Sequence, residues 1–167
     1  MGNKKIYAIA KKDPDGYLKP AILINNKEVF KDTLLRFSYY LEGDNKLVRI
    51  KNSESFYLLM HVRDAPDSDK YNVFLFEGDV VKNVGSSICD IFEDIDGDGF
   101  MEVGGAELIE SPCFPPPCDS TYYNPVNIFK LSESYEFDTI NSQKLTKEKY
   151  GIYLGSKQLY IKVKRIK

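Results

Sequence analysis

The sequence has no tryptophan, one histidine and three cysteines in 167 residues. A structural zinc site needs four ligands, almost always cysteine and histidine, so His61 and three cysteines do not predict one. No stretch approaches the roughly 18 apolar residues of a transmembrane helix, and Met1 to Lys5 do not read as a signal peptide. Two explanations are open at this point: the protein is extracytoplasmic with its signal removed, or it is cytoplasmic.

Positive charge is missing from a long part of the chain, although the net charge is only −2. Between Asn83 and Phe129 there is no lysine or arginine. The acidic residues of this stretch are Asp90, Glu93, Asp94, Asp96, Asp98, Glu102, Glu107, Glu110 and Asp119. Such a block repels itself unless a cation or a basic surface offsets it. No global feature indicates nucleic acid, and the alternatives are a solvated acidic face or an unknown, basic protein partner.

Strand-forming residues are abundant, with twelve tyrosines, ten phenylalanines and many branched aliphatic residues. Short apolar runs separated by turn residues predict one all-β domain over residues 1–167, built of antiparallel hairpins in a meander. The expected hairpins join Ala21–Ile24 to Glu28–Phe30, Leu35–Leu41 to Leu47–Ile50, Asn72–Phe76 to Val80–Val84, and Val126–Leu131 to Tyr135–Thr139. Helix is expected at most as one turn at Leu145–Tyr150.

The most informative segment carries alternating acids at Asp94, Asp96 and Asp98, followed by Gly99 and then Glu102. Alternate acids on a tightly curled loop can all point inward, and calcium takes six to eight oxygen ligands. Glycine permits the sharp turn that lets the next carbonyl face the ion. The segment therefore predicts a calcium site.

The predicted ligands are the side chains of Asp94, Asp96, Asp98 and Glu102 and the main-chain carbonyl of Phe100. The alternative is an acidic surface turn that binds nothing. An EF-hand is not expected, because its twelfth position carries a bidentate glutamate, and that position is Gly105 here.

In these residues the sequence resembles the FG-GAP or VCBS type of β-propeller repeat, in which a D-x-D-x-D-G-x-x-[DE] loop lies between two strands of a blade. The resemblance covers about residues 56–108 and implies a structural calcium ion, residence outside the cytoplasm, and binding surfaces in place of catalysis. It also implies a propeller-like fold or a partial propeller. Because only one loop is complete and propellers close with four to eight blades, a β-sandwich is the alternative.

Two cysteines, Cys113 and Cys118, enclose Phe114 and three prolines. A pair that closes a short proline-rich loop predicts a disulfide in an oxidising compartment, with Cys89 as a free thiol. The alternative is two reduced, partly buried thiols.

No nucleophile elbow, phosphate-binding loop or zinc motif is present, and no catalytic residue is assigned. The expected function is that of a non-catalytic, calcium-stabilised protein-binding module, such as an inhibitor or an immunity protein. The first alternative is a hydrolase that uses acidic residues near the loop. The second is a cytosolic calcium sensor, which would need helices around an apolar groove.

Overall fold

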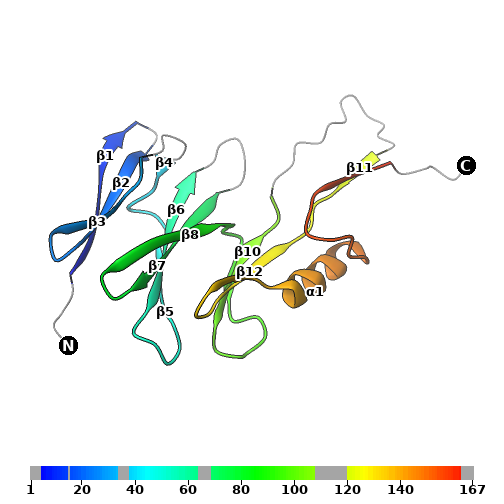
Figure 1. Ribbon diagram of the computed structural model, residues 1–167. Helices are drawn as coiled ribbons and strands as arrows, with labels where there is room; N and C mark the ends of the chain where they lie inside the picture. Colours follow the sequence, from blue (N-terminus) through cyan, green and yellow to red (C-terminus); the bar gives the residue numbers. More distant parts are fainter. Residues whose placement is uncertain (1–4, 15, 34–37, 64–68, 108–119, 163–167) are drawn as a thin grey trace, which may run out of the picture.

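A computed structural model describes residues 5–14, 16–33, 38–63, 69–107 and 120–162 (Figure 1). The elements in chain order are β1 Ile6–Asp13, β2 Gly16–Ile24, β3 Lys27–Lys31, β4 Ser38–Tyr39, β5 Lys46–Arg49, β6 Phe56–Arg63, β7 Lys70–Glu77, β8 Val80–Ile88, β9 Ile91–Glu93, β10 Met101–Gly105, β11 Ser120–Tyr123, β12 Asn127–Leu131, β13 Tyr135–Phe137, α1 Thr139–Tyr150 and β14 Leu159–Lys162.

The strands form antiparallel sheets. The first sheet has eight strands in the order β1-β2-β4-β6-β7-β8, with β3 paired to β2 and β5 paired to β6. The second has four strands in the order β13-β12-β10-β9, and β11 pairs with β14. The predicted all-β, antiparallel class is confirmed. The described residues form neither a closed barrel nor a propeller.

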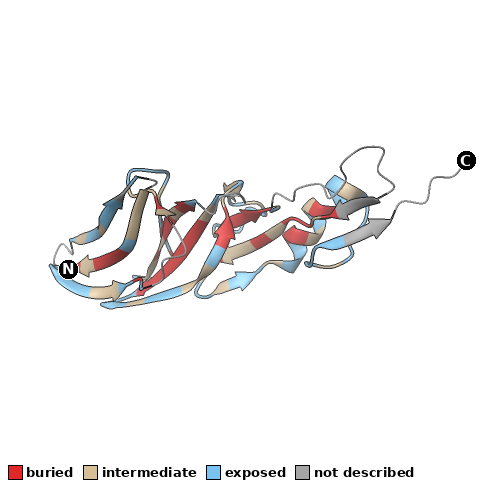
Figure 2. Cartoon of the chain, turned by 90° about the horizontal axis from the view of Figure 1, so that it is seen from above, coloured by how far each residue is buried: buried red, intermediate tan, exposed pale blue. Residues whose placement is uncertain are grey.

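The centre of the first sheet is buried on both faces. Along β6 and β7, Tyr57, Leu59 and Val73 point to one side, while Met60 and Phe74 point to the other. Side chains alternate along a strand, so these runs supply two separate apolar clusters. Figure 2 shows that burial is concentrated on the strands and not on the turns that join them.

The second sheet packs on one of these clusters. Val103 of β10 and Leu131 of β12 are buried there, and Phe92 of β9 and Phe129 of β12 lie at the edge of the same cluster. The other cluster lies between the remaining face of β6 and β7 and the N-terminal strands, where Ile22 is fully buried. The apolar side chains of the first cluster therefore determine how the second sheet packs on the first.

Three of the four predicted hairpins are present. Asn25 and Asn26 join β2 to β3 with φ values of 51° and 68°, a left-handed backbone that asparagine tolerates. Gly78 lies in the turn that joins β7 to β8, where Glu77 pairs with Val80. Strands β12 and β13 also pair as expected.

The predicted hairpin between Leu35–Leu41 and Leu47–Ile50 is wrong for the residues that the structure describes, which leave out residues 35–37. Both β4 and β5 pair with β6, and they lie one after the other along it. The Asn45 side chain fills the gap between them: its amide donates to the carbonyl of Tyr40 at 2.9 Å, and its oxygen accepts the N–H of His61 at 2.9 Å. This side chain replaces ladder bonds that a continuous strand would make.

The helix is longer than expected, and it begins where a strand was predicted to end. Asp138 caps it by accepting the N–H of Asn141 at 2.9 Å, and Gly151 ends it with φ 73°. These are standard start and stop residues of a helix. The residues that α1 buries are polar, namely Asn141, Ser142 and Thr146, so no apolar periodicity marks it in the sequence.

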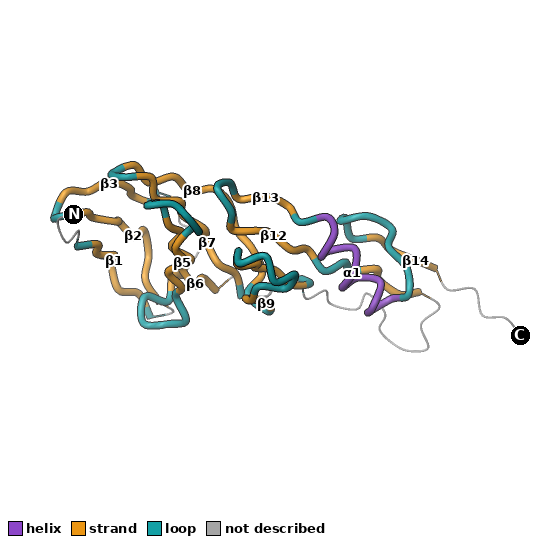
Figure 3. Tube along the Cα trace, turned by 90° about the horizontal axis from the view of Figure 1, so that it is seen from below, coloured by secondary structure: helices purple, strands orange, loops and turns teal. Residues whose placement is uncertain are grey.

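Helix α1 takes the place of a strand beside β12, at the end of the molecule opposite to β1 (Figure 3). Pairing of β12 with β13 ends at Phe129. Beyond it, Ser142 Oγ accepts the N–H of Ile128 at 2.9 Å, and Thr146 Oγ1 accepts the N–H of Val126 at 3.0 Å. The helix hydroxyl groups thus satisfy main-chain groups that a strand would otherwise pair. No helix among the described residues is long and apolar enough to cross a membrane.

We expect Thr146→Val to lower the free energy of unfolding by about 1–3 kcal/mol, because the isosteric change leaves the buried N–H of Val126 without an acceptor. Urea unfolding measures this change. Lys147→Ala, on the exposed side of the same helix, is the control and should stay within about 0.5 kcal/mol of the wild type. Equal stability of Thr146→Val and wild type would contradict the role of the hydroxyl.

Candidate metal centre

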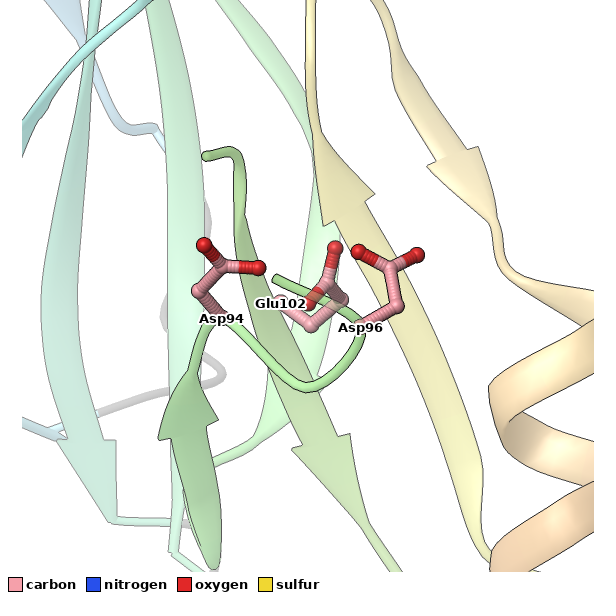
Figure 4. A group of neighbouring side chains, drawn as sticks. All are labelled: Asp94, Asp96 and Glu102. Carbon is pink, nitrogen blue, oxygen red and sulfur yellow. The ribbon is translucent and has the colours of Figure 1, made fainter. Parts of the chain in front are cut away.

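The acidic segment forms the connection between β9 and β10 in the second sheet. Glu102 lies on β10 directly opposite Glu93 of β9, so the chain turns back on itself between them. Figure 4 shows Glu102 between Asp94 and Asp96, with the three side chains drawn together by the curl of the loop. The predicted loop between two strands is therefore present.

The main chain of the loop is held by its own acidic side chains. The two oxygens of Asp94 accept the N–H groups of Gly97 at 2.8 Å and Gly99 at 2.9 Å. Asp96 Oδ1 accepts the N–H of Asp98 at 3.1 Å. Such local bonds are typical of aspartate in turns, and they set the curl before any ion is considered.

Two glycines make this curl possible. Gly97 has φ 76° and Gly99 has φ 89°, in the left-handed region that other residues adopt at a cost. Gly99 also leaves room for a neighbour, since a Cβ there would lie 2.7 Å from Lys51 Nζ. That ammonium group donates to the main-chain carbonyl of Asp98 at 2.8 Å and so ties the loop to the turn after β5 in the first sheet.

Three of the predicted ligands come together. Asp94, Asp96 and Glu102 each place a carboxylate oxygen within 4.8 Å of the others, a group that could hold a metal ion. Two oxygens on opposite sides of one calcium ion lie roughly 4.6–5.2 Å apart, given bond lengths of about 2.3–2.6 Å. The cluster therefore has the size of one cation shell.

Glu102 is the unusual member of this cluster, because its side chain is fully buried. Its Oε2 accepts the N–H of Ile95 at 2.7 Å, while its Oε1 accepts no hydrogen bond from the described residues. Burial is the main cause that raises the pKa of Glu102, and the nearby Asp96 and Asp98 carboxylates raise it further. A buried carboxylate oxygen without a partner costs free energy unless a cation or a proton reaches it.

Sequence reasoning missed the cation that the protein itself brings to the loop. Lys130 Nζ, from β12, lies 2.5 Å from Asp98 Oδ2, 3.1 Å from Asp96 Oδ2 and 3.6 Å from Glu102 Oε1. Its bond to Asp98 is the main cause that raises the pKa of Lys130 and, in return, lowers the pKa of Asp98. Only the pairing of β12 with β10 could have revealed it, because Lys130 lies opposite Glu102 in that register.

The two other predicted ligands lie in the same loop but outside the close group. Asp98 is engaged by Lys130 through Oδ2 and accepts the N–H of Phe100 through Oδ1 at 2.9 Å. The Phe100 side chain packs at the edge of the apolar cluster between the sheets. That the main-chain carbonyl of Phe100 and the side chain of Asp98 bind the ion stays a prediction.

Only one of the three cysteines lies within the described residues, and it does not belong to the close carboxylate group. Cys113 and Cys118 lie outside the described residues, so their disulfide stays a prediction. Cys89 is a free thiol whose Sγ donates to the carbonyl of Asp69 at 3.0 Å. Burial, together with Asp69 and Asp90, raises the pKa of Cys89 to about 11, which disfavours the reactive thiolate.

The described residues thus define a mostly β protein with one acidic loop that could hold a metal ion. Comparison with protein families, with curated proteins and with solved structures finds no match for this chain. The resemblance to FG-GAP or VCBS repeats therefore rests on the loop residues alone.

We expect Gly99→Ala to destabilise the protein more than Gly97→Ala when both are unfolded with urea in chelator. Both changes impose a left-handed backbone on alanine, at about 1–2 kcal/mol. Only a Cβ added at position 99 would collide with Lys51. The hydrogen bond from Lys51 to the carbonyl of Asp98 is then also lost, at about 1 kcal/mol more. The extra destabilisation of Gly99→Ala over Gly97→Ala should vanish when both are made in the Lys51→Ala variant. If the difference persists there, Lys51 does not hold the loop.

Proposed function

We propose that the loop Asp94–Glu102 binds one calcium ion as a structural element of a non-catalytic protein-binding domain that works outside the cytoplasm. The observation that carries the proposal is Glu102 Oε1, a buried oxygen that accepts no hydrogen bond within a cluster of carboxylates. A cation among these oxygens would satisfy it and offset the charge of its neighbours.

The ligand set favours calcium. All the candidate side chains offer oxygen, which suits a hard cation and not zinc or copper. Asp94, Asp96 and Glu102 form the centre of the set. Asp98 and the Phe100 carbonyl would bring the number of protein ligands to five, with water completing six to eight. Magnesium wants a tighter octahedron and keeps more of its water.

A structural role fits the position of the loop. It joins β9 to β10, and Lys51 holds it against the first sheet. An ion bound to Asp94 and Glu102 together would connect the two ends of the loop and stiffen the edge of the second sheet. Binding to the folded state alone then raises stability by mass action.

The protein-binding part of the proposal rests on the exposed acids and on the resemblance to VCBS-type repeats. Asp90, Glu93 and Glu107 are exposed, and they lie in the part of the chain that has no basic residue. Such a surface favours a basic partner, as in an inhibitor or an immunity protein. Calcium in the millimolar range outside the cytoplasm suits a structural site of modest affinity.

Calcium should raise the melting temperature of the wild type, by roughly 5–11 °C when it exceeds its dissociation constant a hundredfold, since this adds about 2.7 kcal/mol. Asp96→Asn should lose most of this increment, because the amide carries no charge. In chelator it should be less stable than the wild type by no more than about 1 kcal/mol, because its oxygen can still accept the N–H of Asp98 while the exposed ion pair with Lys130 is lost. Differential scanning calorimetry with and without chelator is the measurement.

Glu148→Gln, an exposed acid on α1, is the matched control and should keep the full calcium increment. The proposed calcium site is wrong if wild-type melting curves coincide in calcium and in chelator, and elemental analysis finds no calcium after equilibration at millimolar concentration.

The partner surface is tested by interferometry against a panel of basic extracellular proteins, a lysozyme among them, in calcium. We expect at least one to bind, more weakly at high salt, and the double variant Asp90→Asn, Glu93→Gln to bind about tenfold more weakly. The control Glu28→Gln, Glu148→Gln removes two exposed acids elsewhere and should bind as the wild type does. Equal losses in both variants, or no binding at all, would count against this surface.

A further inference from the structure

A row of charges crosses all four strands of the second sheet. In the observed register Glu93 of β9 faces Glu102 of β10, Glu102 faces Lys130 of β12, and Lys130 faces Glu136 of β13. Residues directly opposite each other in antiparallel strands point to the same face. Lys130 therefore has a carboxylate neighbour on each side, Glu102 in the metal centre and Glu136 away from it.

The ammonium group of Lys130 occupies the place of a cation in the acidic loop. It contacts Asp98 and Asp96 at 2.5 and 3.1 Å, and it lies 3.6 Å from Glu102 Oε1, too far for a hydrogen bond. One positive charge thus serves several carboxylates and leaves the buried Glu102 oxygen without a hydrogen bond. A divalent ion carries twice the charge and accepts more oxygen ligands.

An ion and this ammonium group cannot share the loop. Both would use the carboxylate of Asp96, which belongs to the close group and contacts Lys130, and their like charges repel at this range. A second carboxylate is available to Lys130, because Glu136 is exposed and lies on the neighbouring strand, with Cβ atoms about 4.5–5.5 Å apart. Glu136 Oε1 accepts the hydroxyl of Ser134, so Oε2 is the oxygen that would receive the ammonium group.

We propose that Lys130 sets the calcium affinity of the loop, acting as an internal competitor that leaves the carboxylates for Glu136 when the ion binds. This inference rests on the proposed calcium site and adds its regulation. Because every binding event must release the ammonium group, the site responds to calcium at high concentration and stays empty at low concentration. Without calcium, Lys130 keeps the loop closed.

The test is calorimetric titration of the full chain with calcium chloride. Lys130→Met keeps the apolar stem and removes the competitor, so its dissociation constant for calcium should fall about tenfold or more. Its melting temperature in chelator should also fall, because the carboxylates lose their counter-ion. Lys82→Met removes an equal charge from an exposed lysine paired with Glu77, and its dissociation constant should stay within about twofold of the wild type.

Glu136→Gln tests the proposed second partner of Lys130 at an exposed position, and its amide oxygen can still accept the hydroxyl of Ser134. It removes the alternative partner of Lys130, so its dissociation constant for calcium should rise about threefold or more. This variant also decides the matter if Lys130→Met does not fold, because an unchanged dissociation constant in Glu136→Gln would then overturn the exchange.

The outcomes separate the two proposals. If neither the wild type nor Lys130→Met binds calcium, the proposed calcium site is wrong and the competition falls with it. If the wild type binds calcium and Lys130→Met binds it equally or more weakly, the calcium site stands and Lys130 is not a competitor. Tighter binding by Lys130→Met with unchanged binding by Lys82→Met supports the inference.

Discussion

The geometry of the candidate metal centre depends on the apolar contact between the two sheets. Val103 and Leu131 are buried in that contact, and Glu102 and Lys130 each lie one residue away on the same strands. Because side chains alternate along a strand, burial of the first pair turns the second pair to the opposite face. A slip of one residue would turn Glu102 and Lys130 into the apolar contact and turn Val103 and Leu131 out of it. The apolar contact thus places Glu102 opposite Lys130, although the two residues lie far apart in the sequence.

Charge balance is the second constraint on this region. The acidic stretch after Asn83 contains no basic residue, and the counter-charges come from outside it. Lys51 reaches the loop from the first sheet, Lys130 from β12, and Lys70 pairs with Glu107 at 3.2 Å. The loop is therefore held both by its own hydrogen bonds and by lysines from distant parts of the chain. An ion would stabilise a loop conformation that these contacts already favour.

Local signals predicted those parts of the fold that local bonds decide. The hairpin at Asn25 and Asn26 follows from residues that tolerate positive φ. The turn between β4 and β5 looked similar, yet Asn45 bonds to β6 and keeps both strands on one edge. Only the last part of helix α1 was predicted, as one turn at Leu145–Tyr150, because Ser142 and Thr146 bury hydroxyl groups, and not apolar side chains, against β12. In both cases the partner lies on a distant strand that no short window contains.

The same division between local and distant contacts applies to the candidate metal centre. The sequence by itself determined the loop, since Asp94, Asp96 and Gly99 are held by bonds that span at most five residues. Tertiary structure decided what surrounds it: the burial of Glu102, the approach of Lys130 from 34 residues away to Asp96, and that of Lys51 from 47 residues away to Asp98. Carboxylate spacing in a turn is set by the covalent chain, whereas solvent exclusion and counter-charge are set by which strands pair and which faces pack.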